Sequence, residues 1–250
     1  MSVVFRIDDI GASTKHFNQH GQKWFKLFGK KNIYFPFANF WFLKTIRPFA
    51  KWAKYDELTE NEWRFFLKVF KENNIVPIIA ITATWVDKDS VLTPFPEKFP
   101  KQAELLKEAF LNGDIIIANH GLTHCVVGEH KPLFWGSNRA SWREFLPELP
   151  ESLHRNHILK SQEILETFFG KPIEILVPPG NMWSVKTYRS LIGTNIKKIM
   201  CNKYMLDSEE EMEGVSFVKD DEKTFAFHDR ELKLYGKEWL MKNIEVWKNL

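Results

Sequence analysis

The sequence predicts an α/β fold, a closed or nearly closed barrel of about seven parallel strands joined by helices. Short β-branched runs alternate along the chain with stretches of helical periodicity, which is typical of a parallel sheet covered by helices. Several of these runs are continuously apolar, as expected of strands that are buried on both faces. A chain of 250 residues suits one barrel, and we expect a single domain over residues 1–250.

The first predicted strand is Val3–Ile7, and the next well-defined element is a helix at Thr59–Asn73. Apolar side chains recur in this helix at helical spacing, and Thr59 is followed by Glu62 as in a capping box. The continuous apolar run Ile75–Thr82 predicts the second strand.

Glycines and prolines mark the ends of the later elements. Gly113 and Gly170 each end a helix, because glycine readily adopts the left-handed conformation found there. Pro178 has no N–H to donate to a strand ladder and ends a strand. The later helices are expected at Lys101–Asn112, His154–Phe169, Val185–Ile192 and Gly236–Leu250. The later strands are expected at Asp114–Ala118, Ile173–Val177, Asn195–Met200, Val215–Val218 and Thr224–Phe227.

Two long stretches, about residues 11–56 and about residues 125–152, follow strands rather than precede them. Active sites of βα barrels lie at this face, so both insertions are expected to border the site. The first mixes basic residues with large aromatics, and the simplest interpretation is a helical insertion whose aromatics pack on the barrel. Two alternatives are a sugar-stacking wall or acyl pocket, and a peripheral membrane contact through residues 24–52.

The composition is that of an ordinary globular protein, with 44% hydrophobic and 27% charged residues. A net charge of +3 by itself implies no nucleic-acid or membrane partner. The apolar run at residues 33–50 is interrupted well short of the ~20 residues that a spanning helix needs. Two cysteines are too few for a disulfide framework, and no signal peptide precedes the first strand, so we expect a cytoplasmic protein.

Acidic and histidine side chains stand where the predicted strands end, and parallel strands would bring them to one rim. One carboxylate of Asp8 and Asp9 can bind a metal while the other stays free as a base only if the backbone bends, which Gly11 permits. His120 and His124, four apart on one helical turn, would present both imidazoles to one ion. The simpler alternatives are a polar strand end and a pair of loop histidines.

The segments RIDDIG, ANHGLTH, ILVPPGN and FAFHD resemble the first, second, third and last motifs of the polysaccharide deacetylase superfamily (NodB homology, carbohydrate esterase family 4) in order and approximate spacing. The resemblance spans nearly the whole chain and implies a distorted (β/α)7 barrel. It also implies a divalent ion, usually Zn²⁺, with iron, manganese and cobalt as further possibilities. In that arrangement the metal ligands are Asp9, His120 and His124, the general base is Asp8, and the general acid is His228.

The chain departs from the family pattern at two places. Val177 stands where many members have an arginine that orients the base, and Arg6, Arg139 or Arg230 could replace it. The aspartate and tryptophan of the fourth motif, which tune the acid histidine, are not recognisable. The candidates for that aspartate are Asp207, Asp220 and Asp229, of which Asp229 is adjacent to His228.

The segment PPGN followed by Trp183 resembles divergent cytoplasmic branches of the superfamily that act in surface-polysaccharide or O-antigen pathways. The expected function is therefore removal of an N-acetyl or N-formyl group from a sugar on a small, nucleotide-linked or lipid-linked carrier. We expect substrate contacts from Pro179, Asn181, Trp183, Trp135 and Arg139. An inactive carbohydrate-binding barrel and a membrane-surface interaction protein are the two competing hypotheses.

Overall fold

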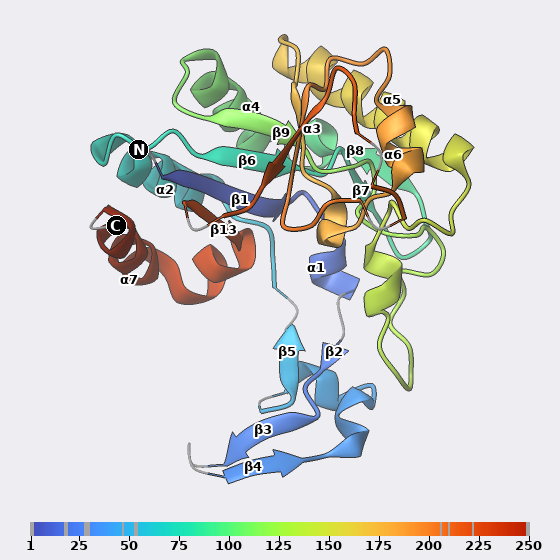
Figure 1. Ribbon diagram of the computed structural model, residues 1–250. Coiled ribbons are helices and arrows are strands. Elements are labelled where there is room, and N and C mark those ends of the chain that lie inside the picture. The colour runs from blue at the N-terminus through green and yellow to red at the C-terminus, as the bar shows by residue number, and fades with distance from the viewer. Residues whose placement is uncertain are drawn as a thin grey trace.

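The structure is a computed structural model that describes residues 3–17, 20–27, 31–46, 48–52, 55–205, 207–209, 211–221 and 223–248. Within these ranges one curled sheet contains seven parallel strands in the order β12-β11-β10-β9-β6-β1-β13 (Figure 1). The strands are β1 (Val4–Ile10), β6 (Ile78–Ile81), β9 (Ile116–Asn119), β10 (Ile175–Leu176), β11 (Lys198–Cys201), β12 (Ser216–Lys219) and β13 (Thr224–His228). No ladder joins β12 to β13 among the described residues, so the fold is a distorted (β/α)7 barrel that is open at this point.

Each strand predicted from an apolar run is present, with shifted ends. The second begins at Ile78, after Pro77, rather than at residue 75. The fourth is reduced to Ile175–Leu176 by the prolines that follow it. The first continues to Ile10, so the two aspartates lie inside β1 rather than after it.

The helices lie outside the sheet (Figure 1). They are α2 (Glu60–Glu72), α4 (Pro100–Leu111), α5 (Glu151–Phe169), α6 (Val185–Ser190) and α7 (Asp229–Lys248), with short α1 (Thr14–Phe17) and α3 (Phe95–Lys98). The last helix begins at Asp229, seven residues before the predicted start. Gly236 (φ 65°, ψ −153°) breaks it into two segments, and the second segment corresponds to the predicted helix. Residues 249–250 of that prediction lie outside the described residues.

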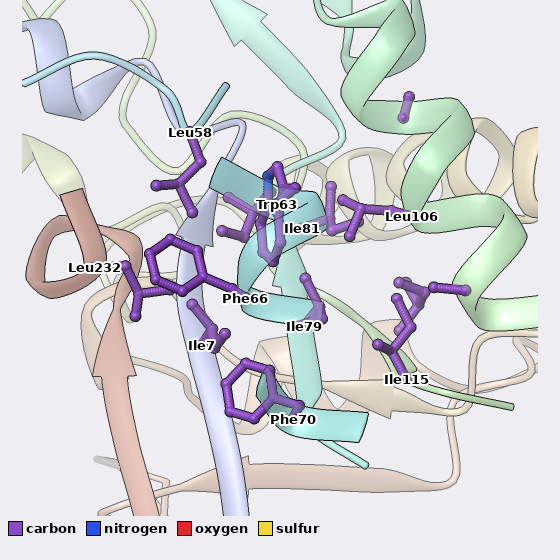
Figure 2. Packing of buried hydrophobic residues seen from close by; sticks show 14 of the residues in the cluster. Ile7, Leu58, Trp63, Phe66, Phe70, Ile79, Ile81, Leu106, Ile115 and Leu232 are labelled. Atoms are coloured by element: carbon purple, nitrogen blue, oxygen red, sulfur yellow. The ribbon is translucent and has the colours of Figure 1, made fainter. Parts of the chain in front are cut away.

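The core between α2 and the sheet confirms the predicted amphipathic helix. Thr59 accepts from the backbone N–H of Glu62, whose carboxylate accepts from the N–H of Thr59, which is the predicted capping box. Figure 2 shows Phe66 and Phe70 of α2 beside Ile7 of β1. This packing holds β1, which carries both aspartates, against a rigid layer.

Among its described residues the insertion after β1 has no α-helix beyond α1, contrary to expectation. It contains two antiparallel pairs that stand away from the barrel in Figure 1. Its strands are β2 (His20–Gly21), β3 (Trp24–Leu27), β4 (Lys31–Tyr34) and β5 (Ala50–Trp52), with 3-10 turns at Pro36–Asn39 and Leu43–Thr45. Residues 28–30 and 47 of the segment considered for membrane contact lie outside the described residues.

Three further features have no counterpart in the predicted elements. A hairpin of β7 (Thr84–Val86) and β8 (Leu92–Pro94) follows β6, and 3-10 turns occur at Arg139–Trp142 and Pro179–Asn181. In the described part of the chain, no helix has the length and apolar character to cross a membrane.

Candidate active site

A cavity lies at the carboxyl ends of β1, β9, β10 and β13, where the polar residues of all four motifs meet. The convergence predicted from the strand ends is therefore present. The lining residues are Asp8, Asp9, Thr14, His120, His124, Arg139, Trp142, Arg143, Pro178, Gly180, Asn181 and His228.

A bulge in β1 lets both aspartates line the cavity. Ile7 pairs with Ile79 and Ile10 with Ile81, so one extra residue is accommodated in β1 between these pairs. The bend that the sequence placed at Gly11 occurs already at Asp9, whose φ is 69°. A left-handed backbone conformation is costly for a residue other than glycine. Residues that are held in such a conformation cluster at functional sites. Asp8 keeps its place in the ladder, opposite His228 of β13.

The two histidines lie on a loop after β9 rather than on a helical turn. Positive φ angles at Gly121 (79°) and His124 (57°) fold this loop back on itself. The buried carboxylate of Glu144 accepts hydrogen bonds from the N–H groups of Leu122 (2.8 Å), Thr123 (3.1 Å) and His124 (2.8 Å). This carboxylate takes the place of a helix in holding the loop.

Glu144 was not identified from the sequence, because it belongs to no motif and lies in the irregular second insertion. Its other partner is His157 of α5, whose Nδ1 lies 2.6 Å from Oε1. Burial raises the pKa of Glu144, but His157 and the backbone N–H groups lower this pKa below its usual value. An acidic residue between two aromatic ones, as in WREF, is the only sequence signal of its burial.

Three side chains form a candidate metal centre. The ligand atoms of Asp9, His120 and His124 lie within 4.8 Å of one another. Oδ1 of Asp9 is 3.2 Å from Nε2 of His120 and 2.9 Å from Nε2 of His124. Nδ1 of His120 lies 2.6 Å from the carbonyl oxygen of Val177. If Nδ1 carries the proton and donates it to this oxygen, Nε2 has a free lone pair that faces Asp9.

The residues fit a divalent ion. Both ring nitrogens of His124 are buried: among the described residues Nδ1 has no hydrogen-bond partner, and Nε2 has only its 2.9 Å contact with Asp9, which is poorly aligned for a hydrogen bond. This arrangement is unfavourable unless a ligand is bound. Burial would raise the pKa of the Asp9 carboxyl, but His228 and His124 lower this pKa well below its usual range. Two imidazoles and one carboxylate are ligands that zinc and neighbouring transition metals accept.

Arg6 occupies the position of a base-orienting arginine. Its guanidinium donates to Asp8 (2.9 and 3.1 Å) and also to Asp220 (2.6 and 3.0 Å). Of the three arginines considered for this place, Arg6 makes the contact, from the same strand as Asp8. Val177, at the family arginine position, instead provides the carbonyl that faces His120.

His228 lies beside Asp8 and faces Glu231, not Asp229. Its Nδ1 is 3.5 Å from Oε2 of Glu231, which also accepts from the His228 backbone N–H at 2.9 Å. Burial lowers the pKa of His228, but Asp9, Glu231 and Asp8 together raise this pKa to about 9. This shift favours the protonated imidazole, which is the form that a general acid requires.

Asp229, predicted to tune His228, belongs to a buried ionic cluster instead. Its carboxylate accepts from Nζ of Lys15 and from the hydroxyl of Tyr55 (2.8 Å). Lys15 also donates to Glu57 (2.6 Å), which accepts from the N–H of Gly11 (2.9 Å). The cluster thus joins α1, the end of the first insertion and the start of α7.

Three residues predicted to contact the substrate do not line the cavity. Trp183 is fully buried and donates its Nε1–H to the carbonyl of Lys203 at 2.9 Å, so it belongs to the hydrophobic core. Pro179 is buried and does not line the cavity. Trp135 is 57% exposed and packs on Phe40, with ring centroids 4.4 Å apart.

Arg139 and Asn181 do line the cavity, as predicted. Trp142, Arg143 and Thr14 line it too. Asn181, with φ 56°, is strained like Asp9 and His124. Positive φ angles are therefore concentrated where the chain faces this cavity.

The chain is similar to one known protein family and to several solved structures. Residues 51–197, more than half of the chain, match the family described as Polysaccharide deacetylase. None of the curated proteins matches the chain. Among solved structures, it is similar to IcaB from Ammonifex degensii (16% identity, TM-score 0.42), with 67% of each chain covered.

Two other solved structures are more distant. One is a family 4 acetyl xylan esterase from Clostridium thermocellum in complex with a cobalt ion (10% identity, TM-score 0.38), with 58% of this chain and 53% of that chain covered. The other is BA3943 from Bacillus anthracis, a CE4 family pseudoenzyme (10% identity, TM-score 0.40), with 57% of this chain and 39% of that chain covered. The chain thus spans about two fifths of the length of that pseudoenzyme.

An open parallel barrel with aspartates and histidines at its strand ends defines the carbohydrate-deacetylase class of hydrolases. The chain belongs to the polysaccharide deacetylase family, which confirms the resemblance. The family match begins at residue 51, after most of the first insertion, although the aspartates of β1 lie before it.

Proposed function

We propose that this protein is a metal-dependent hydrolase that removes an N-acyl group, acetyl or formyl, from a sugar. One observation carries the proposal: Asp9, His120 and His124 cluster within ligand distance, with Asp8 and His228 paired beside them on β1 and β13. A bound divalent ion would polarise the acyl carbonyl and lower the pKa of an attacking water.

The side chains of the chain divide the proton transfers between them. Asp8, held by Arg6, accepts the proton of the attacking water. His228, kept protonated by the carboxylates around it, donates a proton to the leaving amine. Because Asp8 and His228 are register partners on neighbouring strands, both act on one acyl group in the same cavity.

Arginines at the cavity support a phosphate-bearing carrier, as in nucleotide-linked or lipid-linked sugars. Arg139 and Arg143 line the cavity from the second insertion. Among the residues that the structure describes, neither has an acidic ion-pair partner. A guanidinium fork suits a phosphate group. The PPGN segment is the support for placing the reaction in surface-polysaccharide synthesis.

Metal content and hydrolysis test the proposal. The wild type, the variant His120→Ala and the control His20→Ala, a histidine of the insertion outside the metal centre, are purified without added metal and analysed for elements. About one divalent ion per chain is expected in the wild type and control and little in His120→Ala. Acetate or formate release from N-acylated nucleotide sugars should follow metal content.

Absence of metal from the wild type would contradict the proposed centre. Retained metal without hydrolysis of any N-acyl sugar would favour an inactive carbohydrate-binding barrel instead.

A further inference from the structure

The two insertions meet and are fastened together beside the cavity. Nζ of the buried Lys44 donates to the carbonyl of Leu133 at 2.7 Å. The side-chain amide of Asn138 donates to the carbonyl of Phe17 at 2.8 Å. A buried lysine and a buried amide fix the relative position of the two loops.

Aromatic rings gather at this junction, and we call them the aromatic platform: the exposed Trp41, Phe42, Phe134 and Trp135 and the half-buried Phe40. Phe40 contacts rings of the second insertion, with centroids 5.1 Å from Phe134 and 4.4 Å from Trp135. Trp41 stacks on Phe134 at 6.5 Å with an interplanar angle of 25°. The rings therefore form one surface rather than isolated side chains.

The platform remains in contact with water despite this packing. Trp41 is 52% exposed, Phe134 58% and Trp135 57%. Trp24, on the β3–β4 hairpin, is 60% exposed and packs on Tyr34. Contiguous exposed apolar surface of this kind marks a binding site.

The charge around the platform indicates the kind of partner. From Gly11 to Tyr55 the sequence has nine Lys or Arg residues and neither Asp nor Glu. Because the whole chain has 35 basic and 32 acidic residues, the remainder has 26 and 32, a net charge of −6. Two of the nine, Lys15 and Lys44, are buried, whereas Lys23 and Lys26 of the hairpin are exposed.

We propose that the aromatic platform and the β3–β4 hairpin bind the surface of an anionic lipid bilayer. Aromatic rings favour the headgroup region of a membrane, and clustered lysines are attracted by anionic lipids. A second copy of the chain, bound through the same surface, would place like charges against each other. A neutral sugar polymer would leave the absence of acidic residues without a role.

None of the platform rings lines the cavity, although both insertions contribute residues near it in sequence. Arg139, which lines the cavity, follows Trp135 by four residues in the second insertion. A bilayer bound at the platform would bring headgroups to the cavity side of the barrel. The inference concerns binding and holds whether or not the cavity hydrolyses an amide.

Vesicle flotation of the full chain tests the proposal. The protein should float with phosphatidylcholine vesicles that contain phosphatidylglycerol and remain behind with pure phosphatidylcholine. Trp41→Ser with Phe134→Ser should abolish flotation, whereas Tyr235→Ser, an equally exposed aromatic on α7, should not. Lys23→Gln and Lys26→Gln should each weaken partitioning about fivefold, equivalent to about 1 kcal/mol per basic residue. Lys101→Gln, an exposed lysine of α4, is the matched control.

Far-ultraviolet circular dichroism and elemental analysis verify that each variant is folded and keeps its metal. The proposal is overturned if the wild type does not float with anionic vesicles, or if the double aromatic variant floats as well as the wild type. It is also overturned if the Trp41 and Phe134 changes abolish self-association rather than vesicle binding.

Discussion

Replacing Arg6 with methionine should destabilise the protein and impair the base at the same time. Arg6 is 1% exposed, and its guanidinium makes four hydrogen bonds to the carboxylates of Asp8 and Asp220. Methionine fills much of the same space but leaves two negative charges without a partner. The loss is therefore electrostatic rather than a loss of packing.

The magnitude follows from the burial of the two carboxylates. Removing one partner of a buried ion pair costs about 3–5 kcal/mol. The side chains of Asp8 and Asp220 retain 10% and 13% exposure, so water relieves part of this cost. We expect a loss near the lower limit, about 3 kcal/mol. Adding Asp220→Asn removes one unpaired charge and should restore about 1–2 kcal/mol.

Urea unfolding and steady-state kinetics measure the two effects. The urea midpoint should fall by ~1 M or more, and kcat should fall about 10²-fold because Asp8 is no longer oriented. Arg6→Lys, which keeps the charge but not the fork, should lie between the variant and the wild type. Equal midpoints for Arg6→Met and wild type would refute the reasoning, as would a double variant less stable than Arg6→Met.

Three further changes test other parts of the site. Glu231→Gln removes a carboxylate that raises the pKa of His228, so the alkaline limb of the pH–kcat/KM profile should move down by about one unit; an unchanged limb would exclude Glu231 from this role. Gly121→Ala places a Cβ 2.2 Å from Oε2 of Glu144, at a φ of +79°, so both stability and metal content should fall, and normal values of both would contradict the described loop. Trp183→Ala should cost about 3–5 kcal/mol in urea unfolding; a raised KM with unchanged stability would instead restore a substrate contact.

The sequence predicted the barrel and the meeting of the motifs because both depend on apolar runs. The inner parallel strands are largely buried on both faces, whereas the edge strands β12 and β13 are partly exposed. An apolar run ends where the chain becomes polar, as at His120. Parallel strands then bring these ends together without any knowledge of loops. Arg6 could be proposed from the sequence as one substitute for the family arginine at Val177. It lies two residues before Asp8, and alternate residues of a strand share a side.

The loops could not be predicted in the same way. Glu144 acts through three backbone N–H groups, a contact that leaves no spacing pattern in the sequence. Trp183 looked like a sugar platform beside PPGN, but its burial depends on β11 and β12, which come later in the chain. Where the structure describes the first insertion, its short strands pair only with each other, so their aromatics carry no barrel periodicity.

The buried cluster around Asp229 makes the first insertion separable from the barrel. Lys15 precedes the strand pairs of the first insertion and Glu57 follows them, yet the two side chains form an ion pair with each other. The barrel therefore holds the first insertion at two neighbouring points, and the part of the insertion that does not contact the second insertion is free to change in length and sequence. A chain in which residues 18–54 are replaced by a short linker would retain these anchors. The first insertion could therefore be exchanged for another segment, which would change the surface that the protein binds and leave the candidate active site unchanged.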